Sequence, residues 1–279
     1  MDPTDGSDER TDENRSTGTV REDDGRPAQQ SPRRRGVGDP SFEVYEDEST
    51  DADVLLAGFS EYGLAGLTAV DYLVDHLDMT DRGHVTTPDL PTITPFDQGT
   101  PRHPIRLFGH DDLPIAVLVG ELPVPLMAAR SFSSALLDWT EAAGVGEIAV
   151  LSGVPMAHTE SDHRTFYVAT EDYRQHRLAD ADVPPMGSGF TDGVKASLLS
   201  QGMESALRVC VYTTPAHPQT PDVPAALRMI ETIDEVYGLD VDTGPLEDFA
   251  ADVEQYYAEL AEHVQRTQEE QLPEDRMYM

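Results

Sequence analysis

Two glycine-rich segments and one histidine-containing segment hold most of the residues that could do chemistry in this chain. The first segment runs from Gly58 to Gly66 and includes Glu61 and Gly63. Glycines let a backbone turn tightly, and the N-terminus of a following helix can hold an anion. The spacing is neither a dinucleotide fingerprint nor a P-loop, and Glu61 would repel a phosphate. A structural turn is therefore favoured over the alternative of nucleotide binding.

The second glycine-rich segment runs from Gly187 to Gly193 and is predicted to be a flexible strand-to-helix turn. It lies next to Lys195, which is the only lysine in the chain. A functional cation retained at this position is one interpretation, and an ordinary surface lysine is the favoured one. The two segments together define a candidate cleft with five residues: Gly63, Gly66, Gly187, Gly189 and Lys195.

The third segment, from His158 to His163, concentrates four residues of metal-ligating type, including Glu160 and Asp162. A metal site needs side chains that converge from a rigid frame, whereas these residues occupy one loop. A solvated loop is favoured over a metal site. Since no segment combines a nucleophile, a base and an orienting group, we predict no catalytic set, no metal and no other cofactor.

The charge balance bears on partners rather than on activity. The chain has 53 Asp and Glu against 19 Lys and Arg, for a formal net charge of −34 over 279 residues. Nucleic acids and anionic membranes need cationic surface, so neither is expected as a partner. An acidic surface with little lysine is typical of a salt-rich, haloarchaeal-type cytoplasm, where self-repulsion is screened. Cys210 is the single cysteine and lies in an apolar run, which predicts a buried thiol on a strand.

Apolar runs and helix-period segments alternate along the chain and predict the elements that must position these residues. Four short apolar runs are predicted strands: residues 53–59, 114–119, 147–152 and 207–212. Five longer segments are predicted helices: residues 63–76, 126–143, 192–203, 224–237 and 246–264. Strands that alternate with helices imply a three-layer α/β/α domain with a mostly parallel central sheet.

The two ends of the chain differ in composition from this domain. Residues 1–50 are rich in charged and small polar residues and are predicted to be a disordered acidic extension. A short basic island at residues 32–36 is interpreted as a solvated linker rather than as a partner contact. Residues 51–264 form the predicted domain, and residues 265–279 a flexible tether. No anchor or signal peptide is expected, so we predict a cytoplasmic protein.

The tether ends in Met277, Tyr278 and Met279. An apolar side chain, a phenol and a terminal carboxylate could together fill a groove, donate a hydrogen bond and pair with a cation. This order resembles the hydrophobic-tyrosine-any (HbYX) tail, by which regulators of the proteasome core particle dock between its α subunits. An accidental match at a frayed end is the alternative, because so short a motif is weak evidence alone.

Short blocks of the domain resemble the proteasome assembly chaperone two family from about Asp53 to Val264. The blocks that carry this resemblance are residues 57–59, 63–66, 71–73, 122–125, 138–139, 151–155, 213–215 and 221–227. The resemblance implies a fold like that of nucleoside phosphorylases, without their catalytic residues, and a homo-oligomer. Archaeal relatives that carry the tail bind the α ring independently of ATP. Met277 would then be the hydrophobic position, Tyr278 the motif tyrosine, and Met279 the free position with the carboxylate.

The domain and the tail agree on one hypothesis: a non-enzymatic protein that binds the core particle, as an assembly chaperone or an ATP-independent activator. The alternative is a small-molecule enzyme, a phosphorylase, hydrolase or ligase, that uses the cleft near Gly63 and Gly187. Only analogy of fold supports that alternative. A plain oligomeric scaffold is a third hypothesis, which holds if the tail is accidental.

Overall fold

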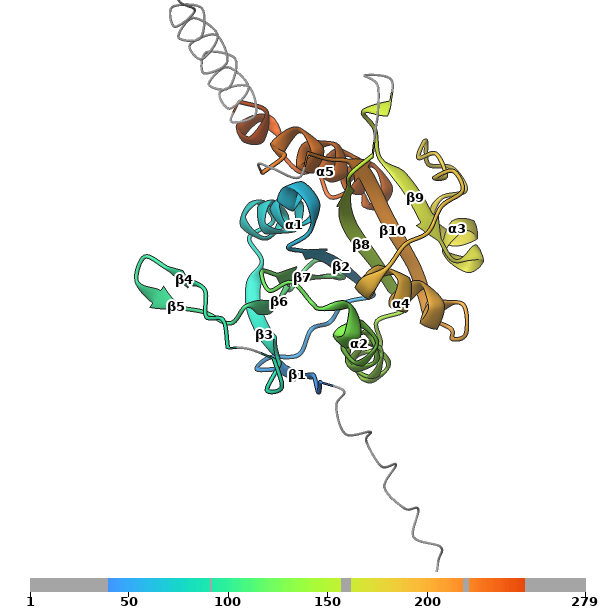
Figure 1. Ribbon diagram of the computed structural model, residues 1–279. Coiled ribbons are helices and arrows are strands. Elements are labelled where there is room, and N and C mark those ends of the chain that lie inside the picture. Colours follow the sequence, from blue (N-terminus) through green and yellow to red (C-terminus); the bar gives the residue numbers. More distant parts are fainter. Residues whose placement is uncertain (1–39, 91, 157–161, 218–220, 249–279) are drawn as a thin grey trace, which may run out of the picture. The chain divides into compact units, whose positions relative to one another are not determined.

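A computed structural model describes residues 40–90, 92–156, 162–217 and 221–248 of the chain (Figure 1). Its centre is an eight-stranded sheet with the order β1-β3-β6-β7-β2-β8-β10-β9. The four middle strands are parallel to one another: β7 (Ile115–Gly120), β2 (Val54–Phe59), β8 (Glu147–Val154) and β10 (Arg208–Pro215). All four were predicted, because strands covered on both faces appear in a sequence as continuous apolar runs.

Four strands that the sequence analysis did not predict extend the sheet on both sides. They are β1 (Glu43–Glu46), β3 (Thr80–Thr86), β6 (Ile105–Gly109) and β9 (Phe166–Ala169). Each pairs antiparallel with its neighbour on the side of the sheet centre. The fold is therefore a mixed α/β fold whose large sheet is mainly parallel at its centre.

Strand β1 corrects the predicted boundary of the N-terminal extension. Its residues lie within the segment 1–50 that was expected to be disordered, yet Val44 pairs with Val85 of β3. Tyr45 also stacks on the His84 ring, with the ring centroids 5.6 Å apart. Backbone pairing with an edge strand needs little apolar content, which is why composition alone did not indicate it. Residues 1–39 of the extension lie outside the described residues.

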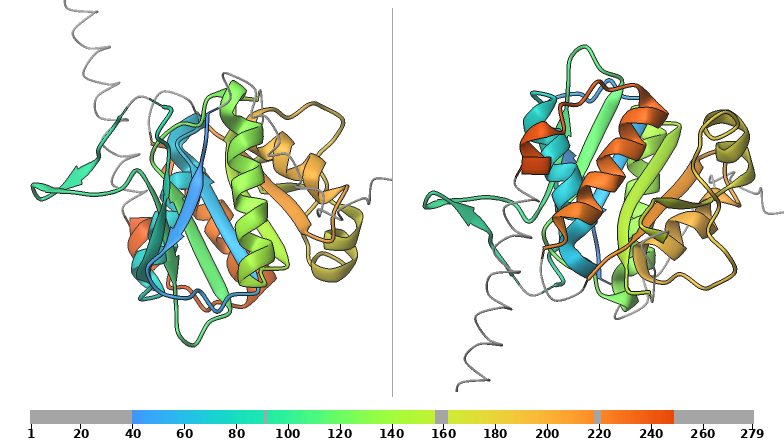
Figure 2. Two further views of the ribbon diagram at one scale, coloured as in Figure 1. Left: turned by 90° about the horizontal axis from the view of Figure 1, so that it is seen from below. Right: turned by 90° about the horizontal axis from the view of Figure 1, so that it is seen from above.

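Helices cover both faces of the sheet and form the three predicted layers (Figure 2). Helices α1 (Ala65–His76) and α5 (Val223–Tyr237) pack on one face, where Leu56 and Leu151 point. Helices α2 (Ala129–Ala143) and α4 (Gly193–Gly202) pack on the other, where Leu55 and Val150 point. Alternate residues of each middle strand thus belong to two separate apolar cores, as the period of two in a strand requires.

Short helical segments and a small hairpin complete the described chain. Turns of 3-10 helix, Tyr62–Leu64 and Leu126–Ala128, precede α1 and α2, and α3 (Glu171–Arg177) follows β9. A two-stranded hairpin, β4 (Phe96–Asp97) with β5 (Thr100–Pro101), lies between β3 and β6. It projects away from the sheet in both views of Figure 2.

The four predicted helices that lie within the described residues are confirmed, each within a few residues of its expected ends. Helix α5 shows why such ends can be predicted: the Asp222 side chain accepts a hydrogen bond from the Ala225 N–H, and Gly238 ends the helix with a φ of 67°. Most of the predicted last helix, from residue 249, and the whole tether lie outside the described residues. Among the described residues, no helix has the length and apolar character needed to cross a lipid bilayer.

Candidate functional site

A lysine, a glutamate and a serine meet near the carboxyl ends of the parallel strands. Glu61 follows β2, Ser152 lies on β8, and Lys195 lies in the first turn of α4. The Lys195 Nζ lies 2.6 Å from Glu61 Oε2 and 2.9 Å from Ser152 Oγ. The Ser152 hydroxyl donates to the same Glu61 oxygen at 2.7 Å. We call these three residues the carboxyl-end cluster.

The expectation that Lys195 is a surface lysine is wrong. Lys195 is 8% exposed, and its ammonium is paired with a carboxylate rather than with bulk water. A buried cation requires such a partner, because transfer of an unpaired charge out of water is very unfavourable. In the sequence analysis, the negative charge of Glu61 was a reason against phosphate binding. In the structure, the same charge pairs with Lys195 and compensates for the burial of that lysine.

A serine hydroxyl between a carboxylate and an ammonium is an arrangement that can activate a nucleophile. Ser152, however, is 1% exposed and lies within a paired strand. A substrate carbonyl cannot reach its Oγ in this structure. The geometry instead ties three elements together, since the cluster joins the turn after β2 to β8 and to α4.

The glycines of the first segment serve backbone packing. A Cβ on Gly66 would lie 2.0 Å from the Leu151 carbonyl oxygen, and one on Gly58 would lie 2.2 Å from the Gly66 carbonyl oxygen. Helix α1 can therefore approach β2 and β8 this closely only because both positions lack a side chain. This packing supports the structural-turn interpretation of the segment.

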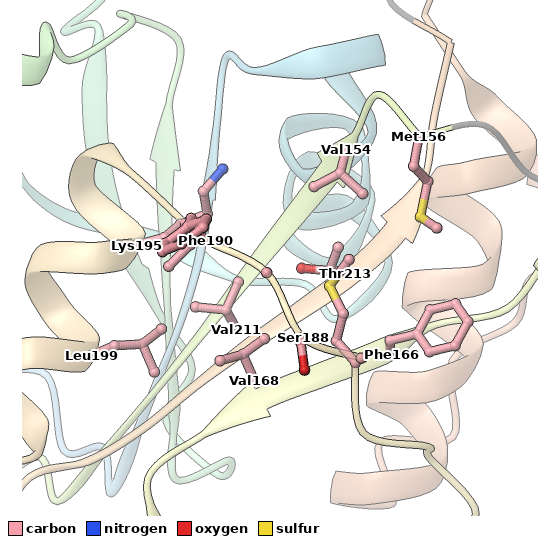
Figure 3. A pocket seen from close by; sticks show the side chains of 14 residues that line it. Val154, Met156, Phe166, Val168, Ser188, Phe190, Lys195, Leu199, Val211 and Thr213 are labelled. Carbon is pink, nitrogen blue, oxygen red and sulfur yellow. The ribbon is translucent and has the colours of Figure 1, made fainter.

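A pocket lies beside the carboxyl-end cluster, on the face of the sheet that α4 covers (Figure 3). Its cavity volume is about 340 Å³. Strands β8, β10 and β9 form its floor, α4 contributes Lys195 and Leu199, and residues 186–191 cover it. Its floor consists of Val154, Phe166, Val168, Val211 and Thr213. We call this cavity the β9 pocket.

The β9 pocket is mainly apolar despite the charged residue in its wall. Figure 3 shows the Lys195 nitrogen pointing away from Val168 and Val211, so the pocket contacts the carbon chain of the lysine. The cluster thus lies behind the wall of the pocket. Ligand sites in open α/β sheets lie at the carboxyl ends of the strands, which is where this pocket is.

The predicted cleft is divided by the structure. Gly187, Gly189 and Lys195 all line the β9 pocket, whereas Gly63 and Gly66 are not among its lining residues. A Cβ on Gly63 would instead lie 2.9 Å from the His217 carbonyl oxygen, on the side of α5. Residues 187–193 are also not a strand-to-helix turn, because they follow α3 and a long loop that bridges to Tyr167 at Pro185.

A second polar cluster, at the amino end of β8, was missed by the sequence analysis. The buried Glu147 carboxylate accepts hydrogen bonds from Tyr237 Oη at 2.8 Å, Arg177 Nε at 3.1 Å and Arg208 Nε at 3.3 Å. Tyr173 continues the network, with its hydroxyl 2.8 Å from that of Tyr237. We call these residues the amino-end cluster. The sequence held a signal for this cluster, since Glu147 is the first residue and Arg208 the second residue of predicted strands in one parallel sheet.

Burial controls the chemistry of the side chains near Glu147. It raises the pKa of Tyr173 and of Tyr237 well above the usual value for a phenol, so both stay neutral hydrogen-bonding groups. Burial likewise raises the pKa of the Cys210 thiol. Cys210 is buried on β10, as predicted, and a thiol of this kind is unreactive.

Two predicted sites lie wholly or largely outside the described residues. The docking residues Met277, Tyr278 and Met279 are beyond residue 248, and only Asp162 and His163 of the histidine-containing segment are described. Within the described ranges, no group of three or more histidine, cysteine, aspartate or glutamate side chains is placed to hold a metal ion.

Comparison with known proteins identifies one family. The model of the PAC2 family matches residues 55–261, which is most of the chain. No protein with a curated description matches the sequence.

Several solved structures share the fold at low sequence identity. Pyrococcus furiosus PbaA, described as an archaeal homolog of proteasome-assembly chaperone, has a TM-score of 0.73 and 19% identity, over 82% of this chain and 95% of that one. P. furiosus PbaB, described as an archaeal proteasome activator, has a TM-score of 0.66 and 18% identity, over 80% and 99%. A Thermoplasma acidophilum protein of unknown function has a TM-score of 0.66 and 24% identity, over 82% and 93%.

Proposed function

Because the chain belongs to the PAC2 family, we propose that it is a non-enzymatic protein that binds the proteasome core particle. It would act as an assembly chaperone or as an ATP-independent activator, in the cytoplasm. The observation that carries the proposal is a PAC2 body in a sequence that ends in Met277, Tyr278 and Met279. Relatives of the same fold are described as a proteasome-assembly chaperone homolog and as a proteasome activator. These descriptions support the proteasome as the partner.

The proposed docking uses the tail against pockets between α subunits. Tyr278 would bury its ring and donate one hydrogen bond, and the terminal carboxylate would pair with a lysine or arginine at the rim. In molar salt the charge pair is screened, so the apolar contacts of Met277 and Tyr278 would supply much of the affinity. A homo-oligomer would present several tails to one ring, and such linkage raises the effective concentration of each tail.

The experiment compares wild type with a Tyr278→Ala variant and with a chain that lacks residues 277–279. Both changes should abolish binding to purified core particles and leave the oligomer unchanged. Tyr278→Phe is the matched control, because it keeps the ring and removes only the hydroxyl, and it should retain partial binding. Undiminished co-sedimentation of the truncated protein with core particles would refute the proposal.

A second pair of measurements separates the two proposed activities. An activator should increase hydrolysis of fluorogenic peptides by preassembled core particles, and Tyr278→Ala should lose this increase. An assembly chaperone should instead accelerate formation of core particles from separate α and β subunits, with little effect on preassembled ones.

The alternative of a small-molecule enzyme has one observation in its favour, the β9 pocket beside Lys195. Its size lies at the low end of the roughly 300–1,000 Å³ that is usual for small-molecule sites. Against an enzyme stands the burial of Ser152 in the carboxyl-end cluster. Calorimetric titration of the protein with nucleosides and with inorganic phosphate tests this alternative, and stoichiometric binding lost in a Lys195→Met variant would favour it.

A further inference from the structure

The β9 pocket has the shape and the lining of a small-molecule site. Strands β8, β10 and β9 form its floor, α4 forms one wall, and residues 186–191 cover it (Figure 3). Known small-molecule sites are concave and mainly apolar, with a few polar groups that fix the orientation of the ligand. The polar groups in the lining of this pocket therefore indicate which class of ligand it takes.

Thr213 is the buried polar residue of the pocket floor. It is 3% exposed, and its oxygen lies among the side chains that line the cavity (Figure 3). Within the described part of the chain, no group hydrogen-bonds to the Thr213 hydroxyl. The hydroxyl of Thr214, by contrast, donates to the Arg164 carbonyl oxygen and accepts from Arg228 Nε. Buried hydroxyls in proteins nearly always have a partner, so Thr213 is placed to bind a polar atom of a ligand.

The surroundings of this hydroxyl suit an organic molecule better than a water molecule. A buried water needs about two to four polar partners. The other hydroxyls of the lining, those of Ser188 and Thr191, belong to the exposed cover, and the Lys195 nitrogen points away from the cavity. The remaining neighbours of Thr213 in the floor are apolar. A molecule with one polar group for Thr213 and a hydrocarbon part for the floor satisfies both.

The lining favours a ligand without a net charge. Lys195 is the one charged residue that lines the pocket, and its ammonium is paired with Glu61 at 2.6 Å. An anion would therefore find no unpaired cation, and a cation would find no carboxylate in the described lining. The cost of burying an unpaired charge comes from its lost hydration, so molar salt does not remove it.

The volume of the cavity sets the size of the ligand. An apolar cavity of about 150 Å³ in another protein holds benzene. The β9 pocket, at about 340 Å³, therefore suits roughly a dozen non-hydrogen atoms. A nucleotide is larger, and it carries several charged and polar groups that this lining cannot pair.

The cover of the pocket permits a ligand to enter. A Cβ on Gly187 or on Gly189 would meet no atom of the described residues within 4 Å, so this segment packs loosely on the body. Phe190 lines the pocket and yet is fully exposed. A bound ligand would cover part of the Phe190 ring, and burial of that apolar area adds to the affinity.

We propose that the β9 pocket binds a small, uncharged, mainly hydrocarbon molecule through one hydroxyl or carbonyl group, which forms a hydrogen bond with Thr213. The hydrocarbon part lies against Val211 of the floor and Leu199 of α4, and the cover lies over it. Binding at this pocket is separate from docking of the tail on the core particle and involves no reaction of the ligand.

Calorimetric titration with four compounds that share a phenylpropyl group tests the class of ligand. Phenylpropanol has one hydroxyl, propylbenzene has no polar group, phenylpropanoate is an anion and phenylpropylamine is a cation. Phenylpropanol should bind the full-length protein with one molecule per chain, and the two ions should bind at least about tenfold more weakly. Absence of phenylpropanol binding, or equal binding of either ion, would overturn the inference.

A Thr213→Val variant tests the hydrogen bond. Valine keeps the shape of threonine and removes the hydroxyl, so phenylpropanol should bind about fivefold more weakly and propylbenzene as well as before. The variant should melt no lower than wild type, because the lost hydroxyl has no partner within the described residues. Thr232→Val is the control, since it removes a hydroxyl from α5, on the other face of the sheet, and should leave both affinities unchanged. An equal loss of affinity for both compounds in Thr213→Val would contradict the proposed hydrogen bond.

Three further variants locate the binding in the pocket. Val168→Trp fills the floor and should abolish it, whereas Met203→Trp adds the same ring at an exposed position that does not line the pocket and should preserve it. Phe190→Ala changes a fully exposed side chain, so it should fold even if Val168→Trp does not. It should weaken binding by at least about threefold. Wild-type affinity in both Val168→Trp and Phe190→Ala would place the binding elsewhere and refute the proposal.

Other occupants of the pocket predict different results. If the tail fills it, a chain that lacks residues 277–279 should bind phenylpropanol more tightly than wild type. If a second copy fills it, titration with phenylpropanol should reduce the size of the oligomer in light scattering. Either result would contradict the proposal. Tyr278→Ala should bind phenylpropanol like wild type, so this inference and the proposed docking fail independently of each other.

Discussion

The two ends of β8 carry polar clusters of similar composition and opposite character. At the amino end, Glu147 is 0% exposed, and its oxygens accept hydrogen bonds from two arginines and a tyrosine. At the carboxyl end, the Glu61 side chain is 27% exposed, and its lysine partner forms part of a pocket wall. In the amino-end cluster, the carboxylate is shielded from solvent by its partners. In the carboxyl-end cluster, the carboxylate is partly exposed to solvent, and the cluster lies beside a cavity.

This difference indicates that the amino-end cluster contributes more to stability than the carboxyl-end cluster. A buried carboxylate is tolerated only when charged and hydrogen-bonding partners surround it, so the amino-end cluster can hardly change without loss of the fold. A partly hydrated pair contributes less to stability and tolerates more change. The pocket and the exposed Phe190 lie at the carboxyl end. Two of the four predictions below compare the clusters directly, and the other two concern the packing of α1 on β8 and the His84 ring of β3; they run from the largest expected effect to the smallest.

Removal of both Arg177 and Arg208 should destabilise the protein most. The double Ala variant leaves the buried Glu147 carboxylate without a countercharge, and the expected loss is about 4 kcal/mol in the free energy of unfolding. Denaturant unfolding at constant salt measures it. Adding Glu147→Gln to the double variant should restore part of the loss, because it removes the unpaired charge. Arg174→Ala, which breaks an exposed pair with Glu171, is the control and should change little.

Gly66→Ala should destabilise the protein by about 3 kcal/mol, at the upper end for overpacking. Its new Cβ would lie 2.0 Å from a backbone oxygen of β8, which cannot move without disturbing the sheet. Gly187→Ala is the matched control from the other glycine-rich segment. A Cβ there would meet no atom of the described residues within 4 Å. Similar stabilities of the two variants, measured by thermal unfolding, would contradict the close approach of α1 to β8.

Lys195→Met should cost only about 1 kcal/mol, less than the arginine double variant. The methionine can fill the space of the lysine chain, and the partly exposed Glu61 can take its hydration from solvent. Denaturant unfolding in the same buffer compares it directly with the amino-end variants. A loss in the free energy of unfolding as large as that of the arginine double variant would show that the two clusters are equally shielded from solvent.

Acidification should weaken the packing of His84 of β3 against His103 by a small amount. Burial is the main cause that lowers the pKa of His84 below its ordinary value of 6.5, and the neighbouring His103 lowers it further, against the opposite effect of Asp47 and Asp81. The unfolded chain then binds the proton more readily, so this contribution is present above pH 6.5 and is lost as the pH falls below it. The comparison of wild type with His103→Gln at pH 8 and pH 5 measures it. Equal pH dependence of the two proteins would show that the stacked pair is not the cause.

The sequence predicted the buried half of this fold well and the half-exposed part poorly. The apolar runs at Val54 and Ile115 indicate strands because both of their faces are covered. Strand β3, with Thr80, Asp81 and Arg82 at its start, is largely exposed there and has no such run. Its pairing depends on the neighbouring strands, so local pattern could not indicate it.

The candidate site shows the same limit. The sequence singled out Lys195 because it is the only lysine, and Gly187 and Gly189 because of their type. It could not indicate that Glu61, which is 134 residues away in the chain, is the partner of that lysine. It also could not separate Gly63 and Gly66 from the pocket, because the helix that carries Gly66 packs on the opposite face of the sheet.

The sequence by itself determined the succession of the middle strands and helices along the chain and the buried thiol of Cys210. These depend on local periodicity and on residue type, which are readable along the chain. The tertiary structure decided which charges are paired and where the pocket lies. Those properties depend on which distant segments meet, and the pairing of distant segments is set by packing of the whole domain rather than by any one stretch of it.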